Sequence, residues 1–340
     1  MRRCKRTLVA VVLATTVVSG TAGWASGTAQ EPVTGPPPGS AAWQREGLPD
    51  PVATTPARIA RFFAALSPGR QRDLVRRHPT VVGNLDGVPV ELRYAANSRT
   101  AQAHGFDRLA DPGRQILALD PRGRGRAAEV YGDLDTAEHV AVVVPGSDMD
   151  ARTFDRTKDP YGTPAGMARS LRDATKGHRT AVIAWAGYTT PVGLGPDAAT
   201  GDLAEAGAGR LARLADGLDA TGAPDPALFC HSYGSVVCGL AAPRLDAADV
   251  VALGSPGMRA KNVGDLRTDA RVWAAKSPSD WIDDIPNVEF AGLGHGADPT
   301  APAFGARRVP AGDAEGHTGY FAPGTRSLRA FAAITLGEEL

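Results

Sequence analysis

Residues 228–239 read Leu228-Phe229-Cys230-His231-Ser232-Tyr233-Gly234-Ser235-Val236-Val237-Cys238-Gly239. A short apolar run leads into Ser232, and an apolar run that can form a helix follows it. This strand–turn–helix context is typical of a nucleophile elbow, a sharp turn that lifts a serine hydroxyl clear of the sheet edge. The usual motif is G-x-S-x-G, and here Cys230 replaces the first glycine. An isolated S-x-G is more often an ordinary turn, so the assignment depends on the partners that such a serine needs.

The sequence on both sides of this stretch alternates predicted strands with predicted helices. Strands are expected at 115–119, 127–131, 140–144, 180–184, 227–230, 249–253, 271–275 and 288–291. Helices are expected between them, notably at 200–220 and 235–242. The strand candidates after residue 140 are mostly unbroken apolar runs, as expected for strands covered on both faces. The alternation predicts an α/β fold with a mostly parallel central sheet and helices on both faces.

A serine hydroxyl is a weak nucleophile that needs a nearby base, which is oriented in turn by a carboxylate. On a parallel sheet these groups come from loops at the carboxyl ends of strands. Asp280 follows the strand expected at 271–275, the second strand after the elbow. Asp283 and Asp284 are close rivals. The order serine, then acid, then histidine is one that known triads use, and it predicts Asp280 as the acid.

Two histidines later in the chain are candidates for the base. His295 lies in Gly294-His295-Gly296, just after the last expected strand, and His317 lies in Gly316-His317-Thr318-Gly319, before a C-terminal helix. Flanking glycines suit a loop histidine that approaches other backbone, so the residues alone leave both open. His231 adjoins the serine, but neighbouring side chains of an elbow diverge, and a packing role is expected for it.

An oxyanion hole needs two backbone N–H donors. One should be the N–H of Tyr233, the residue after the nucleophile, and the other should come from the loop after the third strand. That strand ends in Val144-Pro145-Gly146-Ser147-Asp148, a Pro-Gly turn. The turn points to the N–H of Ser147, with Asp148 as the alternative.

Charge and short motifs give no support for nucleic-acid, metal or dinucleotide binding. The 340 residues contain 37 Lys and Arg against 37 Asp and Glu, so charge gives no argument for nucleic acid or an anionic membrane. His295 and Asp298 lack a second closely spaced ligand pair for a metal. Gly123-Arg124-Gly125 lacks the later glycine and the acidic residue of a dinucleotide fingerprint. We expect no metal and no cofactor, a small-molecule or lipid ester as partner, and a monomer.

Residues 1–29 are typical of an export signal. Four basic residues precede a short apolar core at 8–18, and small residues then cluster at 23–27. The apolar core is shorter than the about 20 residues of a membrane-spanning helix, although an uncleaved anchor is the alternative. The predicted organisation is a signal peptide at 1–29, a Pro/Gly-rich linker at 30–55 and one domain at 56–340. Two short helices are expected at the start of this domain, and the protein is expected to be secreted.

Export changes the interpretation of the cysteines. Cys4 would leave with the signal peptide, and Cys230 and Cys238 remain as an even pair in an oxidising compartment. One lies at the end of the strand before Ser232 and the other about two turns into the following helix. The sequence therefore predicts a disulfide between them, with two buried free thiols as the alternative.

Several motifs together resemble a known family. They are Gly83-Asn84-Leu85-Asp86-Gly87-Val88-Pro89, Val144-Pro145-Gly146, Trp185-Ala186-Gly187-Tyr188, the elbow, Gly294-His295-Gly296-Ala297-Asp298-Pro299, Phe304-Gly305-Ala306 and Gly316-His317-Thr318-Gly319-Tyr320. From about residue 55 to its end, the chain resembles an actinobacterial α/β-hydrolase family long catalogued as a domain of unknown function. The resemblance implies a Ser–Asp–His hydrolase and carries over Ser232, Asp280 and His317, which favours His317 over His295. Cys230 is a departure, because the family usually has glycine there.

The sequence as a whole predicts a secreted serine hydrolase that acts on carboxylic esters. Ser232 would attack, His317 would transfer the proton, Asp280 would orient the imidazole, and the N–H groups of Tyr233 and Ser147 would bind the oxyanion. The alternative is a catalytically inactive scaffold of the same fold that serves as a binding protein at the cell envelope, because a fold does not fix a function.

Overall fold

The computed structural model describes residues 30–340. The predicted signal peptide, and the alternative of an uncleaved anchor, lie outside these residues. In the part that the structure describes, no helix has the length and apolar character needed to cross a membrane.

The described residues form a central sheet of eight strands in the order β1-β2-β4-β3-β5-β6-β7-β10. The strands are β1 (Ile116–Asp120), β2 (Arg126–Tyr131), β3 (His139–Val144), β4 (Thr180–Ala186), β5 (Ala227–His231), β6 (Asp249–Leu253), β7 (Arg271–Ala275) and β10 (Arg307–Arg308). β2 is antiparallel to both β1 and β4, and all other neighbouring strands are parallel. The predicted α/β fold with a mostly parallel sheet is confirmed.

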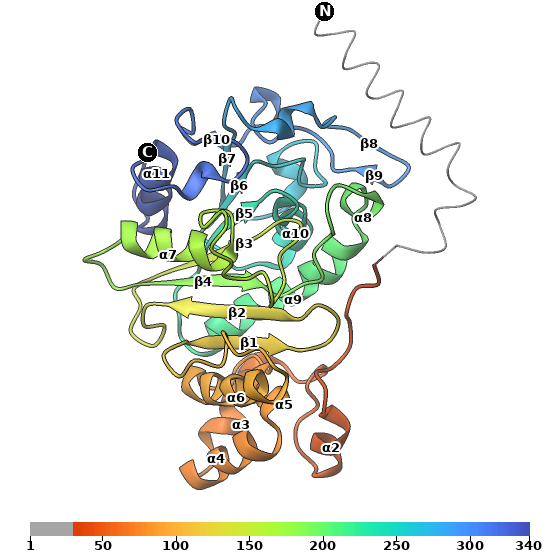
Figure 1. The fold of residues 1–340 in the computed structure, drawn as a ribbon, viewed down its shortest axis with the longest axis vertical. Helices are drawn as coiled ribbons and strands as arrows, with labels where there is room; N and C mark the ends of the chain where they lie inside the picture. Colours follow the sequence, from red (N-terminus) through yellow and green to blue (C-terminus); the bar gives the residue numbers. More distant parts are fainter. Residues whose placement is uncertain (1–29) are drawn as a thin grey trace, which may run out of the picture.

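Helices cover both faces of the sheet (Figure 1). α9 (Asp202–Ala220) and α10 (Gly234–Ala241) pack on one face, and α7 (Pro164–Ala174) and α11 (Arg326–Thr335) pack on the other. β3 shows why its apolar run is unbroken: Val142 and Val144 face the first core, while Ala141 and Val143 face the second. Because side chains alternate along a strand, a strand buried on both sides needs apolar residues at every position.

Shorter elements connect these layers. They are the helix α8 (Pro196–Ala199) and the 3₁₀ helices η1 (Ala242–Arg244), η2 (Val263–Leu266), η3 (Trp281–Asp284), η4 (Pro302–Phe304) and η5 (Gly319–Phe321). The loops that contain η3 and η5 follow β7 and β10 at the edge of the sheet where Ser232 follows β5. The fold therefore brings three distant segments to one end of the sheet.

The strand expected at 288–291 is a correction. Glu289–Phe290 (β8) pairs with Leu293–Gly294 (β9) in a separate two-stranded hairpin, and the last strand of the central sheet is β10. Val288 and Phe290 are 59% and 82% exposed, so their apolar side chains do not face a core. The apolar pattern that suggested a buried strand belongs instead to a hairpin on the surface, at the upper right of Figure 1.

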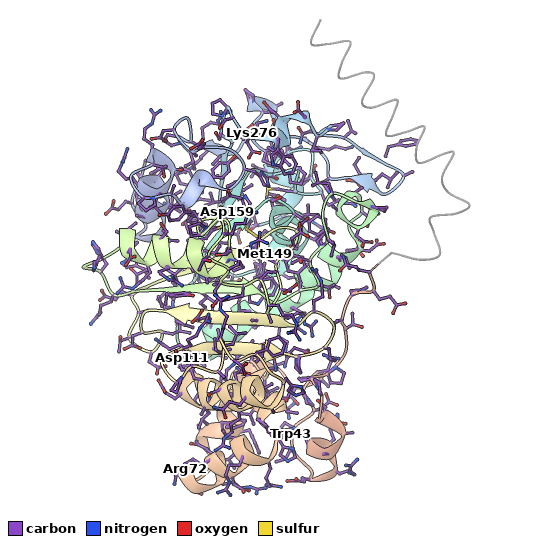
Figure 2. All side chains as sticks on the ribbon, viewed as in Figure 1. Trp43, Arg72, Asp111, Met149, Asp159 and Lys276 are labelled. Carbon is purple, nitrogen blue, oxygen red and sulfur yellow. A yellow bond between two sulfur atoms is a disulfide. The ribbon has the colours of Figure 1, made fainter. Side chains whose placement is uncertain are left out.

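Five helices lie before the sheet within the described residues, where two were expected. α3 (Pro56–Ala64) and α4 (Pro68–Arg77) match the expectation, and α2 (Ser40–Arg45), α5 (Pro79–Gly83) and α6 (Val90–Ala103) do not. α2 falls inside the expected linker, and its Trp43 is fully buried with Ile59 and Phe63. Figure 2 labels Trp43 in this N-terminal part, beyond β1. Residues 40–45 therefore pack onto the following helices, and an extended conformation for this part is wrong.

Candidate active site

Ser232 occupies the turn between β5 and α10 in a strained backbone conformation. Its φ is 55°, in the left-handed region that non-glycine residues adopt rarely and at a cost. The turn is tight because its neighbours are glycines: a Cβ on Gly234 would lie 2.4 Å from the carbonyl oxygen of Val144, and one on Gly146 would lie 2.6 Å from Ser232 Cβ. The N–H of Ser232 donates to the carbonyl of Leu253 in β6 at 2.9 Å. This geometry is that of a nucleophile elbow.

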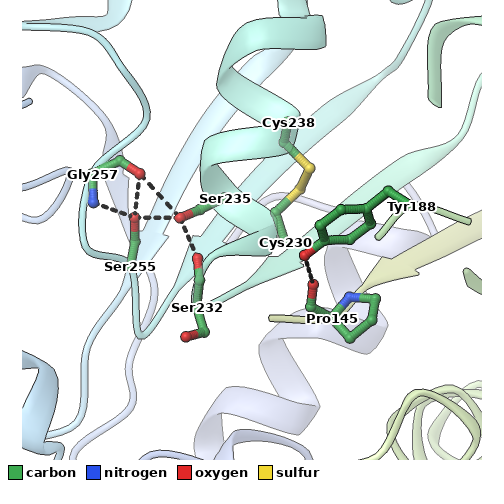
Figure 3. Close-up of a disulfide and its surroundings, with 8 residues drawn as sticks. All are labelled: Pro145, Tyr188, Cys230, Ser232, Ser235, Cys238, Ser255 and Gly257. Carbon is green, nitrogen blue, oxygen red and sulfur yellow. Dashed lines mark hydrogen bonds between the residues drawn. A yellow bond between two sulfur atoms is a disulfide. The ribbon is translucent and has the colours of Figure 1, made fainter. Parts of the chain in front are cut away.

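The predicted disulfide between Cys230 and Cys238 is present (Figure 3). Cys230 belongs to β5 and Cys238 to α10, and both are fully buried. The bridge therefore ties the strand before Ser232 directly to the helix after it. Cys230 takes the place of the first glycine of the motif without opening the turn, because its side chain is directed into the bond with α10.

A hydroxyl network holds the other side of the elbow (Figure 3). Ser235 Oγ lies 2.6 Å from the carbonyl oxygen of Ser232, to which it donates, and 2.6 Å from Ser255 Oγ. The N–H of Gly257 donates to Ser255 Oγ at 3.0 Å. All of these groups except the Ser232 side chain are buried. The loop after β6 thus fixes the first turn of α10.

The structure places Asp280 at the start of η3, where it is 3% exposed. One carboxylate oxygen is 2.8 Å from His317 Nδ1 and accepts the N–H of Ile282 at 2.9 Å. The other accepts the hydroxyl of Tyr320 at 2.5 Å. Burial raises the pKa of Asp280, but these hydrogen bonds and the His317 ring outweigh it and lower the pKa below its ordinary value. Asp280 is therefore a carboxylate at neutral pH.

The rival acids have other surroundings. Asp283 and Asp284 are both exposed. Asp283 forms an ion pair with Lys276, at 2.6 Å, and Lys276 is labelled in Figure 2 on the loop after β7. Neither carboxylate contacts a histidine among the ion pairs and hydrogen bonds of residues 30–340.

His317 lies between two aromatic rings. The centroid of its ring is 4.6 Å from that of His231 and 4.4 Å from that of Trp281. Because Nδ1 faces the Asp280 carboxylate and donates to it, the neutral ring carries its proton there and Nε2 has a free lone pair. That is the tautomer that a general base requires.

His295, the other candidate for the base, lies in a different environment. Its Nε2 donates to the carbonyl of Ala198 at 2.7 Å, and its ring packs edge-on against Tyr233 with 5.5 Å between centroids. It is buried and does not reach Asp280. The structure brings Asp280 together with His317 and does not bring His295 to either of them.

His231 has a specific contact that sequence reasoning missed. Its ring is 5% exposed, and its Nε2 is 2.7 Å from the backbone carbonyl oxygen of His317. Burial and the neighbouring His317 ring lower the pKa of His231 to about 3, so the ring is neutral at pH 7 and donates Nε2–H to that carbonyl. The two residues are 86 positions apart, and nothing in the sequence indicates the contact.

Ser232 and His317 line one cavity of about 200 Å³ at the end of the sheet. Its walls also include Ser147, Met149, Leu194 and Trp281. The side chains of Leu194 and Trp281 are 66% and 39% exposed and form an apolar rim.

The N–H groups expected to bind an oxyanion lie at the turns beside this cavity. Within residues 30–340, the N–H groups of Ser147 and Tyr233 donate to no other group, whereas the N–H of Asp148 donates to the carbonyl of Pro191 at 2.8 Å. The hydroxyl of Tyr188 donates to the carbonyl of Pro145 at 2.7 Å and supports the Pro-Gly turn (Figure 3). Of the two donors considered for this turn, Ser147 is the one left free.

The residues considered for a metal are engaged elsewhere. Asp298 binds Lys276 at 2.5 Å, and His295 binds the carbonyl of Ala198. In the described part of the chain, no three His, Cys, Asp or Glu side chains gather as a metal site would require.

Comparison with known proteins identifies the family of the chain. A family model described as alpha/beta hydrolase matches residues 120–290, half of the chain. The chain belongs to this α/β-hydrolase family. The matched residues include the elbow and Asp280 but end before His317.

The curated relatives and solved structures have low sequence identity to this chain. Uncharacterized proteins of two Mycobacterium tuberculosis strains, CDC 1551 / Oshkosh and H37Rv, are each 28% identical over 391 residues, which cover 91% of this chain and 57% of theirs. The chain thus spans little more than half the length of these relatives. An α/β serine hydrolase without lid from Xanthomonas campestris is 17% identical, with 66% of this chain and 94% of that one covered at a TM-score of 0.40. An esterase domain from a Rhodothermus marinus protein is 13% identical, with 63% and 91% covered at a TM-score of 0.34.

Proposed function

We propose that this α/β hydrolase is a serine esterase that cleaves carboxylic esters through an acyl-enzyme on Ser232. The observation that carries the proposal is the arrangement at one cavity: a strained elbow serine, and a histidine whose Nδ1 is 2.8 Å from a buried carboxylate. Serine, acid and base also follow one another along the chain in an order that known triads use.

In the proposed mechanism, Ser232 Oγ attacks the ester carbonyl carbon while Nε2 of His317 accepts the hydroxyl proton. The imidazolium that forms is stabilised by the Asp280 carboxylate. The N–H groups of Tyr233 and Ser147 stabilise the tetrahedral oxyanion, each by on the order of 3 kcal/mol. Collapse of the intermediate expels the alcohol with the proton from His317. Water then attacks the acyl-enzyme by the same route, which releases the acid and restores Ser232.

The cavity suggests the size of the acyl group. A volume of about 200 Å³ is small, and the exposed Leu194 and Trp281 lie at its rim. We therefore propose esters of short acyl chains, with the alcohol portion directed over the apolar rim. An ester is favoured over an amide because an alkoxide leaves with less help from an acid than an amine does.

The proposal includes export. It rests on the predicted signal peptide at 1–29 and on the disulfide, since disulfides persist in oxidising compartments. The exported chain would act as a monomer on small-molecule esters. The N-terminal sequence and the mass of the protein recovered from culture medium test the signal cleavage, and sedimentation tests the monomer.

The central test is active-site labelling with a fluorophosphonate probe. We expect the wild type to be labelled on Ser232, and Ser232→Ala to lose both labelling and the hydrolysis of p-nitrophenyl acetate. Ser98→Ala, in α6 and far from the cavity, is the matched control and should behave as the wild type. A folded wild type that takes no label would favour the inactive binding scaffold instead.

The same assay separates the two histidines. We expect His317→Ala to reduce the rate by several orders of magnitude, because the base acts with Ser232 as a unit. His295→Ala should cost far less, because His295 contacts Ala198 and Tyr233 and not Asp280. The reverse result would assign the base to His295 and contradict the proposed triad.

A further inference from the structure

A second cavity of about 300 Å³ lies away from Ser232, and its walls share no residue with the cavity at the elbow. Its walls come from β1, β2, α9 and the chain segment at 33–37. This segment is anchored there: Arg122 donates to the carbonyl of Thr34 at 2.9 Å, and Arg126 donates to that of Val33. The cavity is therefore a built feature of the fold and not a gap between loose segments.

Positive charge exceeds negative charge in its walls. Four arginines face two aspartates, namely Arg93, Arg126, Arg210 and Arg213 against Asp86 and Asp120. Both carboxylates are already shared between two arginines each. Asp86 is 3.0 Å from Arg93 and 3.7 Å from Arg213. Asp120 pairs with Arg122 at 2.7 Å and with Arg126. A further guanidinium in these walls has no carboxylate of its own.

Arg210 is that further guanidinium. Its Nε donates to the carbonyl of Gly187 at 2.6 Å, and no carboxylate of residues 30–340 lies within ion-pair distance of it. Burial and the nearby Arg126 lower the pKa of Arg210 to about 10, so it stays cationic at neutral pH. Arg210 is partly buried, and Asp120 and Asp86 act on it only from beyond ion-pair distance, so a bound anion would give it a direct partner.

A second observation points the same way. Arg126 is 3% exposed, lines the cavity, and its Nε has no hydrogen-bond partner. Buried donors are usually satisfied, and an exception in a charged cavity indicates a missing acceptor. The cavity thus presents two guanidinium groups whose donors are not all used.

The remaining walls are apolar and include Pro36, Val52, Trp185 and Leu214. A volume of about 300 Å³ falls at the lower end of small-molecule sites and exceeds what a free phosphate or acetate would fill. Guanidinium groups recognise carboxylate and phosphate in a forked, two-point manner. A ligand that matches these walls has one oxyanion head and a compact apolar body.

We propose that this cavity binds a small organic oxyanion, a carboxylate or phosphate monoester with an apolar body, whose head pairs with Arg210. The inference is independent of the proposed esterase reaction, because none of these residues takes part in it. It can be tested on the full chain with simple probes.

The test is calorimetric titration of the full chain with benzoate, phenyl phosphate, inorganic phosphate and benzamide. We expect benzoate or phenyl phosphate to bind with a Kd below 1 mM, and added NaCl to weaken the binding. Benzamide, which has the same body without the charge, should not bind. Inorganic phosphate should bind at least tenfold more weakly than the organic anions. Tighter binding of benzoate would indicate that the natural ligand is a carboxylate. Tighter binding of phenyl phosphate would indicate a phosphate monoester.

Variants assign the site. Arg210→Gln should weaken binding of the organic anion at least tenfold, while Arg329→Gln should leave it unchanged. Arg329 is a matched control because its guanidinium also donates to a backbone carbonyl, that of Gly324, but on the surface of α11. Should Arg210→Gln not fold by circular dichroism, Arg210→Lys keeps the charge, loses the forked donor, and should weaken binding several-fold.

Three results would overturn the proposal. The first is a wild type that binds neither organic anion at millimolar concentration. The second is binding of benzamide as tight as that of benzoate, which would make the cavity a purely apolar site. The third is an unchanged affinity in the folded Arg210 variant, which would place the anion elsewhere on the protein.

Discussion

At the scale of single residues, the most informative contact is the one between the two histidines beside Ser232. His231 is rigidly placed by the elbow, and it donates to the backbone carbonyl of His317 at 2.7 Å. Asp280 binds the side chain of the same residue, through Nδ1 of the imidazole. His231 is therefore a positioning residue for the proposed reaction: it does not touch the reacting atoms, but it sets where the loop that carries His317 lies.

This role can be separated from simple packing with two variants. His231→Gln keeps an N–H donor at similar reach, whereas His231→Leu fills the space without one. We expect kcat/KM for p-nitrophenyl acetate to fall about tenfold in the Leu variant, the worth of one buried hydrogen bond, and only a few-fold in the Gln variant. The loss should be in kcat and not in KM, because the substrate itself is not contacted. Equal losses in both variants would mean that ring packing alone matters.

The pH dependence of stability gives an independent readout on the same residue. Within the fold the pKa of His231 is about 3, whereas an unfolded histidine titrates near 6.5. Between these values only the unfolded chain binds the proton, so stability falls as the pH drops below about 6.5. Between pH 7 and pH 5, the free energy of unfolding measured in urea should fall by about 2 kcal/mol more for the wild type than for His231→Gln. Equal losses would show that His231 is charged in the native protein.

Some contacts of the candidate site could be predicted from the sequence, and others could not. Chain order and loop position were enough to favour Asp280 and to reduce the base to two histidines, of which His317 lies 2.8 Å from Asp280 in the structure. They could not separate His317 from His295 without the family resemblance, because glycine flanks both. Which carbonyl His231 would meet depends on how two loops fold back over β5, and that is a tertiary contact without a local signal.

At the scale of elements, strand prediction succeeded where burial dictates composition. β3 to β7 carry apolar residues at nearly every position because both faces are covered. β10 could not be predicted, because it consists of two arginines at the edge of the sheet. α6 was missed for a related reason: it buries Arg93, Asn97 and Thr100, so apolar periodicity is absent from it.

The disulfide that joins β5 to α10 should stabilise the fold. The disulfide closes a short loop, with a separation of eight residues between Cys230 and Cys238. On the loop-entropy model such a bridge stabilises the fold by about 2.5 kcal/mol. Cys230→Ala with Cys238→Ala should therefore lower the free energy of unfolding in urea by roughly that amount. Because both sulfurs are buried, reductant should act on the native wild type only as fast as it unfolds. An unchanged unfolding midpoint in the double variant would contradict this.

At the scale of the whole molecule, residues 30–340 form three apolar cores. Two lie on the faces of the sheet, and the third lies within the N-terminal helices beyond β1. Other residues of 30–55 contact distant parts of the chain: Gln30 donates to Asp197 of α8, Val33 donates to Thr189, and Arg213 of α9 donates to the carbonyl of Thr54. A proline- and glycine-rich composition predicts an extended chain but not what the chain lies against, so these contacts could not be predicted.

Trp43 provides the test of that third core. It is fully buried against Ile59 and Phe63, and its indole N–H donates to the carbonyl of Pro49 at 2.6 Å. Truncation of a buried aromatic residue costs about 3–5 kcal/mol. Trp43→Ala should therefore lower the free energy of unfolding in urea by about that much, whereas Val52→Ala, 58% exposed in the same segment, should change it by less than about 0.5 kcal/mol.

The form of the unfolding curve then decides how the cores are coupled. α6 packs directly on β1 and α3 packs on α9, so the N-terminal helices share surfaces with the sheet layer. If they unfold together with it, Trp43→Ala shifts one transition, and the proposed esterase activity is lost together with the circular dichroism signal. We expect this single transition, because buried contacts join the cores. An early transition that leaves activity intact would show that the N-terminal helices unfold as a separate unit. If Trp43→Ala leaves the stability unchanged, residues 30–55 would be a linker, as the sequence predicted.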